Sequence, residues 1–369
     1  MILLAFRCVQ SSARTAWSLP ASGLRAVCWH TCTPFCLSDT IWIMKVVVTG
    51  GAGYIGSHVV RRLVGRGDKV VVIDLLESSS EKSLPEGVEL VKGDVGDRGV
   101  WERVLGGSDV NAILHFAGYI QAGESVLEPG KYLTNNLVKP VVMLEAMVKS
   151  GVNKLIFSSS AGIYGNPEKL PIWEDHSKRP TNPYGVTKWL FEEVLGYYDR
   201  KYGIKSVSLR YFNAAGAEVG GKYGEAHIPE SHIIPLAIEA AKSGGEFKLF
   251  GTDYPTADGT CVRDYIHIED LGEVHLLALE KLLGGAQTDA INVGSGKGWT
   301  NRQVLEMVER VVGKKINIRE GPQRAGDAHT LVAGVEKMKK EWGWEPKHSD
   351  LAEIVRSAWE WHSGHPEGY

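Results

Sequence analysis

"KVVVTGGAGYIGS", residues 45–57, joins a run of β-branched residues to a glycine-rich turn and to the start of an amphipathic stretch, SHVVRRLVGRG. The β-branched run predicts a buried strand, and the pattern after the turn predicts a helix. Gly50, Gly53 and Gly56 stand at this strand-to-helix junction, where glycines allow a tight turn and let backbone amides approach a pyrophosphate. The stretch therefore predicts the dinucleotide-binding turn of a Rossmann-type fold.

An acidic residue supports this prediction. The second expected strand, KVVVID (69–74), ends at Asp74, 18 residues after Gly56. A carboxylate at this place binds the ribose hydroxyls of adenosine and repels a 2′-phosphate, so NAD is predicted rather than NADP. A purely structural glycine turn followed by a strand-end aspartate remains the alternative at this point.

Short apolar runs alternate with helical patterns after Met44, which predicts an α/β fold of the doubly wound, Rossmann type with a parallel sheet covered on both faces. From about residue 214 the rhythm loosens and Gly, Pro and polar residues interrupt it, which predicts a smaller, mixed second lobe at the C-terminal end. We therefore expect an NAD-binding domain over 44–212 and a lobe over 213–369, with a soft and possibly interleaved boundary. The expected strands of the sheet cover residues 45–49, 69–74, 88–94, 112–118, 154–160 and 206–213.

Composition excludes some classes of partner. The chain has 369 residues, 43% of them hydrophobic, and a net charge of −3. This charge gives no reason to expect a nucleic-acid partner. No apolar run approaches the roughly 20 residues needed to span a bilayer, so no membrane span is predicted.

Residues 1–43 differ from the rest of the chain. They hold four of the five cysteines, three arginines and no lysine or glutamate. A transit peptide fits loosely and a secretory signal fits badly; a translation start placed too early, with Met44 as the initiator, is favoured. The cluster CWHTCTPFC (28–36) matches no usual zinc spacing, so no metal site is predicted. Beyond Met44 only Cys261 remains, which favours a reducing, cytoplasmic location.

A second glycine-rich segment, NVGSGKGWTN (292–301), also follows an apolar run and precedes a helical pattern. No acid-ended strand follows it. Thr300 and Gln303 have the spacing of a capping box at the start of a helix. We therefore interpret this segment as structural.

Tyr184 and Lys188, in NPYGVTKW (182–189), are four residues apart and would share one face of a helix. A free tyrosine has a pKa near ~10 and is a poor base, but a neighbouring ammonium and a positively charged nicotinamide both favour the phenolate. Ser160 ends the expected strand 154–160, at the edge where ligands bind in this architecture. The three side chains form an acid–base set for removing a hydroxyl proton while hydride leaves carbon. A core tyrosine with a solvated lysine is the bland alternative.

Several motifs together make a resemblance specific. From Met44 to its end the chain closely resembles the UDP-glucose 4-epimerases, a group of the extended short-chain dehydrogenase/reductase family. The motifs that carry the resemblance are VTGGAGYIGSH, ILHFAG with GESV, FSSSAGIYG, NPYGVTK, LRYFNAAGA, DGTCVRDYIHIEDL and RAGD.

The resemblance implies roles for individual residues. Ser160, Tyr184 and Lys188 correspond to the catalytic positions, and His232 stands where an asparagine is common. Leu331 occupies the position that limits room beside the C2 substituent of the sugar. The implied NAD contacts, with the glycines above, are Tyr54, Ile55, Asp74, Asp94, Val95, Phe116, Ala117, Gly118, Asn135, Tyr184, Lys188 and Phe212. The implied UDP-sugar contacts are Ser160, Asn213, His232, Arg263, Arg324, Asp327 and Leu331.

The implied activity is the NAD-dependent interconversion of UDP-glucose and UDP-galactose, in galactose metabolism. A related epimerase acting on UDP-N-acetylglucosamine and UDP-N-acetylgalactosamine is the first alternative. A nucleotide-sugar dehydratase is less favoured, because Ala161 and Gly162 follow Ser160 where an acid pair is expected. An NAD-binding regulator is also less favoured, because such proteins commonly lose the tyrosine or the lysine. The resemblance also implies a homodimer formed through helices of the sheet domain.

Overall fold

The computed structural model describes residues 43–107 and 109–369. The predictions about the N-terminal extension and its cysteine cluster concern residues outside this range, except for Ile43. Within the described residues, no helix has the length and apolar character needed to cross a membrane.

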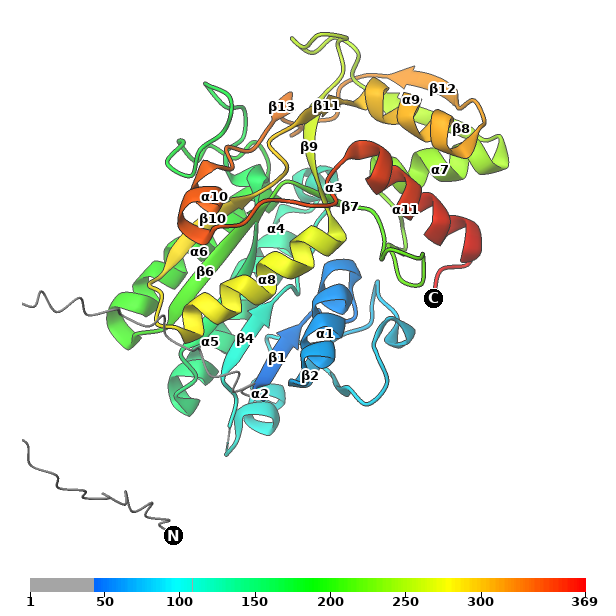
Figure 1. The fold of residues 1–369 in the computed structure, drawn as a ribbon. Coiled ribbons are helices and arrows are strands. Elements are labelled where there is room, and N and C mark those ends of the chain that lie inside the picture. The colour runs from blue at the N-terminus through cyan, green and yellow to red at the C-terminus, as the bar shows by residue number, and fades with distance from the viewer. Residues whose placement is uncertain (1–42, 108) are drawn as a thin grey trace, which may run out of the picture. The chain divides into compact units, whose positions relative to one another are not determined.

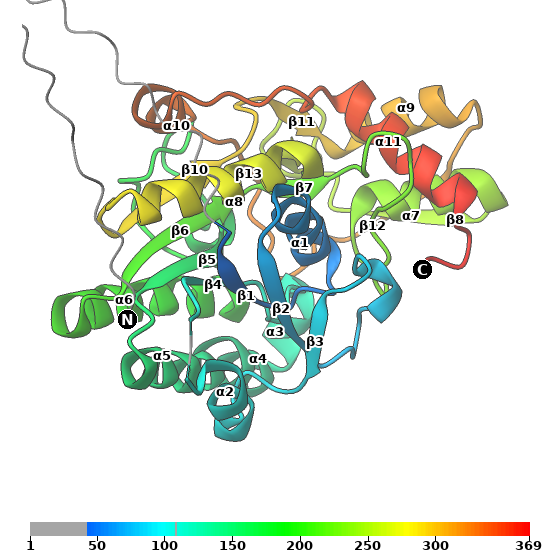
Figure 2. The same cartoon turned by 60° about the horizontal axis from the view of Figure 1, so that its bottom comes forward.

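The central feature is a seven-stranded sheet in which all neighbouring strands are parallel (Figures 1 and 2). The strand order is β10-β6-β5-β4-β1-β2-β3. This confirms the predicted Rossmann-type sheet. The strands are β1 (Lys45–Thr49), β2 (Lys69–Asp74), β3 (Glu89–Lys92), β4 (Ala112–His115), β5 (Lys154–Ser160), β6 (Lys205–Tyr211) and β10 (Asp289–Val293).

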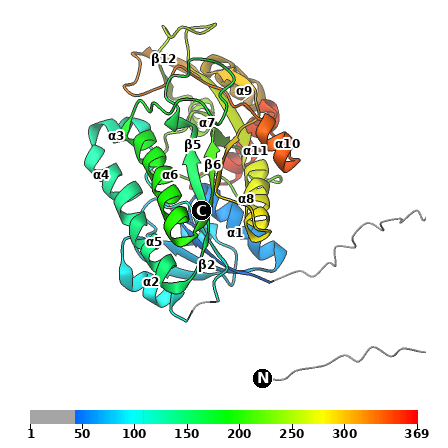
Figure 3. The same ribbon diagram turned by 90° about the vertical axis from the view of Figure 1, so that its left-hand side faces the viewer.

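Helices cover both faces of the sheet, as Figure 3 shows. Val46 and Val48 of β1 belong to one apolar cluster and Val47 to another, because successive side chains of a strand point to opposite faces. Burial on both faces explains why the strands read as continuous apolar runs. The helices of the first face are α1 (Tyr54–Arg66), α8 (Ile268–Leu283) and α10 (Glu336–Trp342); those of the second are α2 (Arg98–Leu105), α5 (Lys139–Ser150) and α6 (Pro183–Tyr202).

Short helical pieces connect β4 to α5 and pack against α6. One of them, η2 (Thr134–Val138), is a π-helical turn, a feature often found at functional sites. The same connection also holds α3 (Ala122–Leu127) and α4 (Pro129–Leu133). Two other short helices lie elsewhere: η1 (Glu81–Ser83) between β2 and β3, and η3 (Ala161–Ile163) directly after β5.

The C-terminal part builds a second apolar core between three helices and two small sheets. The helix after the second glycine-rich segment begins with the predicted capping box: the Gln303 amide donates to Thr300 Oγ1 (3.2 Å), and the Thr300 amide donates to Gln303 Oε1 (2.9 Å). The elements of this part are α7 (Ile233–Ser243), α9 (Asn301–Val312), α11 (Leu351–Gly364), β7 (Asn213–Ala215), β8 (Glu246–Phe250), β9 (Val262–His267), β11 (Gly298–Thr300), β12 (Asn317–Gly321) and β13 (Thr330–Leu331).

The chain returns to the large sheet after entering the second lobe. β10 pairs with β6, and α8 packs against α1, although both follow residue 213 in the sequence. β10 and α8 therefore belong to the large sheet and its helical cover, although both lie within the range predicted for the second lobe. The boundary at residues 212 and 213 stays a prediction.

Candidate active site

The glycine-rich turn between β1 and α1 lies against the end of β4. Gly50 has a positive φ of 68°, and a Cβ on it would lie 2.6 Å from the backbone nitrogen of Ala117. A Cβ on Gly56 would lie 2.2 Å from the Gly50 carbonyl oxygen. Both positions therefore require glycine. Among the described residues no side chain caps α1 at Gly53, so the amides of its first turn are available to an anion such as a pyrophosphate.

Asp74 lies at the end of β2 beside this turn. Its Oδ2 accepts the Ala52 amide (2.9 Å), while its Oδ1 accepts the Leu76 amide and the Ser79 hydroxyl (both 2.9 Å). A carboxylate has about four acceptor sites, so Asp74 retains capacity for a ribose hydroxyl. These contacts fix the carboxylate next to the glycine turn, where the sequence analysis placed it.

Residues after β4 continue along the same edge. The amides of Phe116 and Ala117 both donate to the Thr49 carbonyl oxygen (2.9 and 3.1 Å), which holds them beside Gly50. A Cβ on Gly118 would lie 3.7 Å from Lys188 Nζ. The predicted cofactor residues after β4 therefore lie between the glycine turn and the predicted catalytic lysine.

Other predicted cofactor residues have partners within the protein. Asp94 pairs with Lys139 and accepts the Gly96 amide (2.7 Å), and the Val95 carbonyl accepts Trp101 Nε1 (2.7 Å). Asn135 donates to Asn136 Oδ1 (3.1 Å). Phe212 is buried after β6, and its amide donates to the Val293 carbonyl (3.0 Å).

The Tyr54 side chain does not point along this edge. It is buried, and its hydroxyl donates to the Gly216 carbonyl (2.6 Å). In the first turn of α1, the backbone amides of Tyr54 and Ile55 are the groups left to contact a cofactor.

The predicted catalytic residues meet at the carboxyl end of β5. Ser160 is the last residue of β5, and its Oγ accepts the Gly162 amide (3.0 Å). Tyr184, in the first turn of α6, lies beside it: a Cβ on Gly162 would be 3.3 Å from Ser160 Oγ and 3.8 Å from Tyr184 Cε1. Lys188 lies one turn further on, 4% exposed, and its Nζ donates to the Ser158 carbonyl (2.7 Å). The structure thus brings all three side chains together.

Burial is the largest cause of the pKa shifts of Tyr184 and Lys188. It raises the pKa of Tyr184, against the neighbouring Ser160 hydroxyl, which lowers it. Burial also lowers the pKa of Lys188 to about 8. The ammonium lies 5.8 Å from the centre of the Tyr184 ring. The lysine alone therefore does not produce the lowered tyrosine pKa that the sequence analysis expected.

Three predicted substrate residues lie on the small sheet around β9. Arg263 and Leu331 are register partners on β9 and β13, and Asn213 on β7 pairs with Tyr265 of β9. Leu331 packs against the apolar cluster that follows Ser160, which includes Ile163. Arg263 is half-buried and forms no ion pair with any described residue. A cation with this environment suits an anionic ligand.

The loop that carries Arg324 and Asp327 is tied to the start of α6. Asn182 caps α6 by accepting the Gly185 amide (2.9 Å), and its Nδ2 donates to the Gly326 carbonyl (3.0 Å). Arg324 Nε donates to Asp327 Oδ2 (3.0 Å). The helix that positions Tyr184 therefore also positions this loop.

His232 belongs to a cluster that the sequence analysis missed. Its Nδ1 donates to the buried carboxylate of Glu225, which also accepts His227 Nδ1 (3.0 Å), and Glu230 lies beside them. Burial pulls the pKa of His232 down, but Glu225 and Glu230 outweigh it and raise that pKa to about 9, against the nearby Arg324. The four donor groups lie within 4.8 Å of one another, a grouping that could hold a metal ion. The proton on His232 makes an ion-pair network the simpler interpretation.

Asn136 is a second residue that sequence reasoning missed. It is buried in the π-helical turn; its Nδ2 donates to the Tyr119 carbonyl and its Oδ1 accepts the Tyr119 amide (both 2.9 Å). These bonds hold the segment after Gly118. The sequence analysis instead predicted an NAD contact for its neighbour Asn135, and no sequence signal distinguishes the two asparagines.

The fold and the site together define a dinucleotide-binding enzyme in which a serine, a tyrosine and a lysine lie together at the edge of the sheet. The chain belongs to the NAD dependent epimerase/dehydratase family, whose family model matches residues 46–294.

Relatives resemble the chain over nearly their whole length. It is 44% identical over 327 residues to a UDP-glucose 4-epimerase of Lactobacillus helveticus, covering 88% of this chain and 99% of the relative. It is 46% identical over 325 residues to one of Rhizobium meliloti (strain 1021), covering 88% and 98%. A crystal structure of UDP-glucose 4-epimerase from Bifidobacterium longum in complex with NAD+ and UDP is similar, with a TM-score of 0.83 and 34% identity, covering 88% of this chain and all of that one.

Proposed function

We propose that this protein interconverts UDP-glucose and UDP-galactose by oxidising and re-reducing C4 of the sugar with bound NAD. One observation carries the proposal: Ser160, Tyr184 and Lys188 meet at the sheet edge where the Gly50 turn and Asp74 also lie. The family and the relatives described above support it.

The glycine turn, the first amides of α1 and Asp74 would hold NAD, which supplies the hydride acceptor when bound. Tyr184 takes the proton of the sugar 4-hydroxyl through its phenol oxygen, and Ser160 hydrogen-bonds the reacting hydroxyl. Because burial raises the pKa of Tyr184, the phenolate needs positive charge nearby. Lys188 supplies part of it, and the positive charge of the oxidised nicotinamide ring supplies the rest.

The second lobe would hold the nucleotide. Arg263, Arg324 and the protonated His232 provide positive charge for the diphosphate, and Asn213 and Asp327 provide polar contacts. Holding only the nucleotide lets the 4-keto sugar turn about its diphosphate link. Hydride then returns to the opposite face of C4, so no net oxidation occurs.

A dehydratase needs an acid and a base to eliminate water from C5 and C6. The turn after Ser160 consists of Ala161, Gly162 and Ile163, and none of them carries a carboxylate. This observation favours the epimerase over the dehydratase. Leu331, which is half-buried, is the position that limits room beside the C2 substituent of the sugar. A leucine there would allow a second, weaker activity on N-acetylated UDP-sugars.

The decisive experiment is to incubate the purified protein with UDP-galactose and to identify the product. UDP-glucose is the expected product. A 4-keto-6-deoxy sugar would support the dehydratase, and tightly bound NAD without any conversion would support the regulator.

We also propose a homodimer and a cytoplasmic location. Val138 of η2 and Tyr197 of α6 are 59% and 65% exposed, which gives this layer of helices an apolar surface for a second copy. Light scattering of the purified protein measures the oligomeric state. The single described cysteine, Cys261, is buried and free, as expected in a reducing compartment.

A further inference from the structure

Glu192 lies on the catalytic face of α6. Tyr184, Lys188 and Glu192 follow one another at intervals of four residues, so they share one face of the helix at steps of about 6 Å. Lys188 Nζ donates to the Ser158 carbonyl of β5 (2.7 Å), and the Tyr184 ring lies beside Ser160 at the turn that follows β5. The third reaches the sheet one turn further along.

The Glu192 carboxylate binds two neighbouring strands at one level. Arg210 of β6 donates from Nε to Oε1 (3.0 Å) and from Nη2 to Oε2 (2.7 Å), and Ser159 of β5 donates to Oε1 (2.5 Å). Ser159 and Arg210 are register partners across β5 and β6. Helix α6 is therefore fastened to both strands one residue before Ser160.

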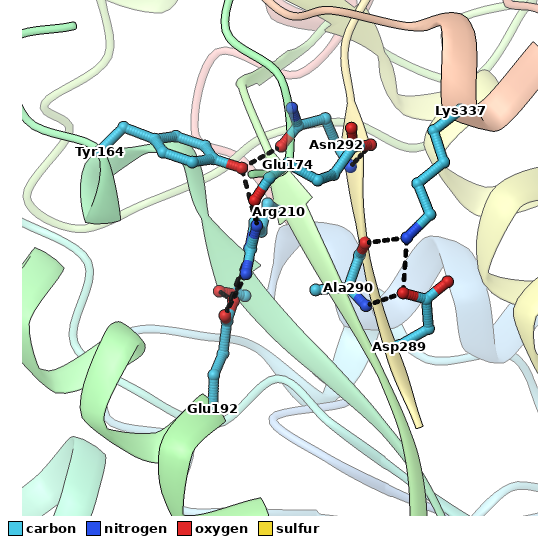
Figure 4. A network of polar contacts seen from close by, with 9 residues as sticks. Tyr164, Glu174, Glu192, Arg210, Asp289, Ala290, Asn292 and Lys337 are labelled. Atoms are coloured by element: carbon cyan, nitrogen blue, oxygen red, sulfur yellow. Dashed lines mark hydrogen bonds and ion pairs between the residues drawn. The ribbon is translucent and has the colours of Figure 1, made fainter. Parts of the chain in front are cut away.

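Arg210 also reaches the segment that follows Ser160. Its Nη1 donates to the Tyr164 hydroxyl (2.8 Å) and to the Glu174 carbonyl (2.9 Å), and the Tyr164 hydroxyl donates to Asn292 Oδ1 (2.7 Å). Figure 4 shows the guanidinium between Glu192 on one side and Tyr164 on the other. The same side chain thus holds the catalytic helix and the turn after the catalytic serine.

The pair is buried, with the Arg210 and Glu192 side chains 5% and 8% exposed. Burial opposes the charge on Arg210, but Glu192 and Tyr164 keep its pKa above its usual value. Apolar residues of similar volume often replace such a pair without loss of stability. What they cannot supply is the fixed geometry of a two-pronged guanidinium–carboxylate contact.

We infer that Glu192 and Arg210 are positioning residues for the epimerisation, because their contact sets where α6 lies along β5 and hence where Tyr184 lies relative to Ser160. The inference rests on the proposed function. A small displacement of a reacting group has a large effect on rate, so loss of the contact acts on turnover rather than on nucleotide binding.

The test compares kcat and KM for UDP-galactose in Glu192→Gln, Arg210→Lys and Glu193→Gln. The first two keep the size or charge of the side chain but lose the two-pronged contact; the third is an exposed neighbour on α6. We expect kcat to fall about tenfold or more in the first two, with little change in KM, and to stay unchanged in Glu193→Gln.

A double variant, Glu192→Leu with Arg210→Met, separates positioning from stability because it leaves no unpaired buried charge. We expect it to fold with near-normal thermal stability and to keep a low kcat. A double variant with normal kcat would overturn the inference, as would Arg210→Lys and Glu192→Gln with normal kcat. An inactive wild-type protein would instead contradict the proposed function, and this inference with it.

Discussion

Lys188 is required by the proposed reaction and yet destabilises the folded protein. Burial lowers its pKa from 10.5 to about 8, so below pH 8 the folded state holds a buried ammonium. Between pH 8 and 10.5 the folded protein has released this proton and the unfolded chain still binds it, so stability rises with pH in that window. The buried charge is therefore a cost at neutral pH.

We expect Lys188→Met to abolish turnover and to stabilise the NAD-free protein at pH 7 by up to about 3 kcal/mol, at about 1.4 kcal/mol per pKa unit. Thermal unfolding of both proteins between pH 7 and 10 measures the difference, which should narrow above pH 8. A difference that does not vary with pH would show that the lysine charge is not its cause.

His232 gives the opposite pH dependence, because its pKa is raised to about 9. Its contribution to folding is full below the unfolded value of 6.5 and is lost as the pH rises through about 9. The same proton supports binding of the diphosphate in our proposal.

We expect the Kd for UDP to rise about tenfold as wild-type His232 loses its proton, since the side chain is partly exposed and one charge-assisted hydrogen bond contributes about 1.5 kcal/mol. Calorimetry should show that the Kd for UDP depends less on pH in His232→Asn than in the wild type. In Glu225→Gln the affinity for UDP should fall at a lower pH than in the wild type, because the carboxylate that raises the pKa of His232 is gone. If His232→Asn kept the wild-type pH dependence, the diphosphate role would be wrong.

Leu331 is expected to influence which UDP-sugars the enzyme accepts. Its place on β13 opposite Arg263 lies beside the apolar cluster after Ser160. We expect the wild type to act mainly on UDP-glucose and UDP-galactose and weakly on UDP-N-acetylglucosamine. Leu331→Tyr should lower kcat/KM for the acetylated sugar about 10- to 200-fold more than for UDP-glucose, since the added bulk costs about 1–3 kcal/mol. Leu331→Met, of similar volume, is the control. Equal selectivity between the two sugars in all three proteins would show that Leu331 does not limit the room beside the C2 substituent.

At the scale of elements, α1 allows a matched pair of glycine substitutions. A Cβ on Gly56 would clash with the Gly50 carbonyl at 2.2 Å, whereas a Cβ on Gly65 would have no atom within 4 Å. Gly56→Ala should weaken NAD binding and destabilise the fold by about 1–3 kcal/mol. Gly65→Ala should stabilise α1 by about 0.5–1 kcal/mol. Melting temperatures with and without NAD measure both effects, and a neutral Gly56→Ala would remove the argument for close packing at the turn.

Elements with a local signal were predictable from the sequence. The apolar runs placed β1, β2 and β5 at their observed residues, and the spacing of Thr300 and Gln303 placed the start of α9. The expected strands 88–94, 112–118 and 206–213 were too long. Their last residues leave the sheet to form the edge at which the candidate site lies.

Contacts distant in sequence were not predictable in the same way. Asn136 acts through Tyr119, and Arg210 holds Glu192 and Tyr164, over separations that leave no periodic pattern. The cluster around Glu225 is local, but it depends on an irregular bend that brings His227 and His232 to one carboxylate, and such a bend has no periodic signal either. Such groups become visible only when the chain is folded.

At the scale of the whole molecule, the proposed reaction needs both parts of the chain. The parallel sheet presents the glycine turn and the catalytic residues at one edge, because all its strands end there. The segments after residue 213 supply Arg263, Arg324 and Leu331, and Asn182 at the start of α6 binds the loop that carries Arg324. This arrangement explains why the glycine turn alone predicted a cofactor but not a substrate.

The central claim is that Tyr184 removes the sugar hydroxyl proton while the C4 hydrogen leaves and returns as hydride. The most direct measurement is the conversion of UDP-galactose in D2O, with mass analysis of C4 in the product, for wild type and Tyr184→Phe. We predict UDP-glucose without deuterium at C4, and a rate about 10²- to 10⁴-fold lower in Tyr184→Phe, the usual contribution of an acid–base group. Deuterium at C4, or near-normal turnover in Tyr184→Phe beside normal turnover in the control Tyr198→Phe on the same helix, would contradict the account.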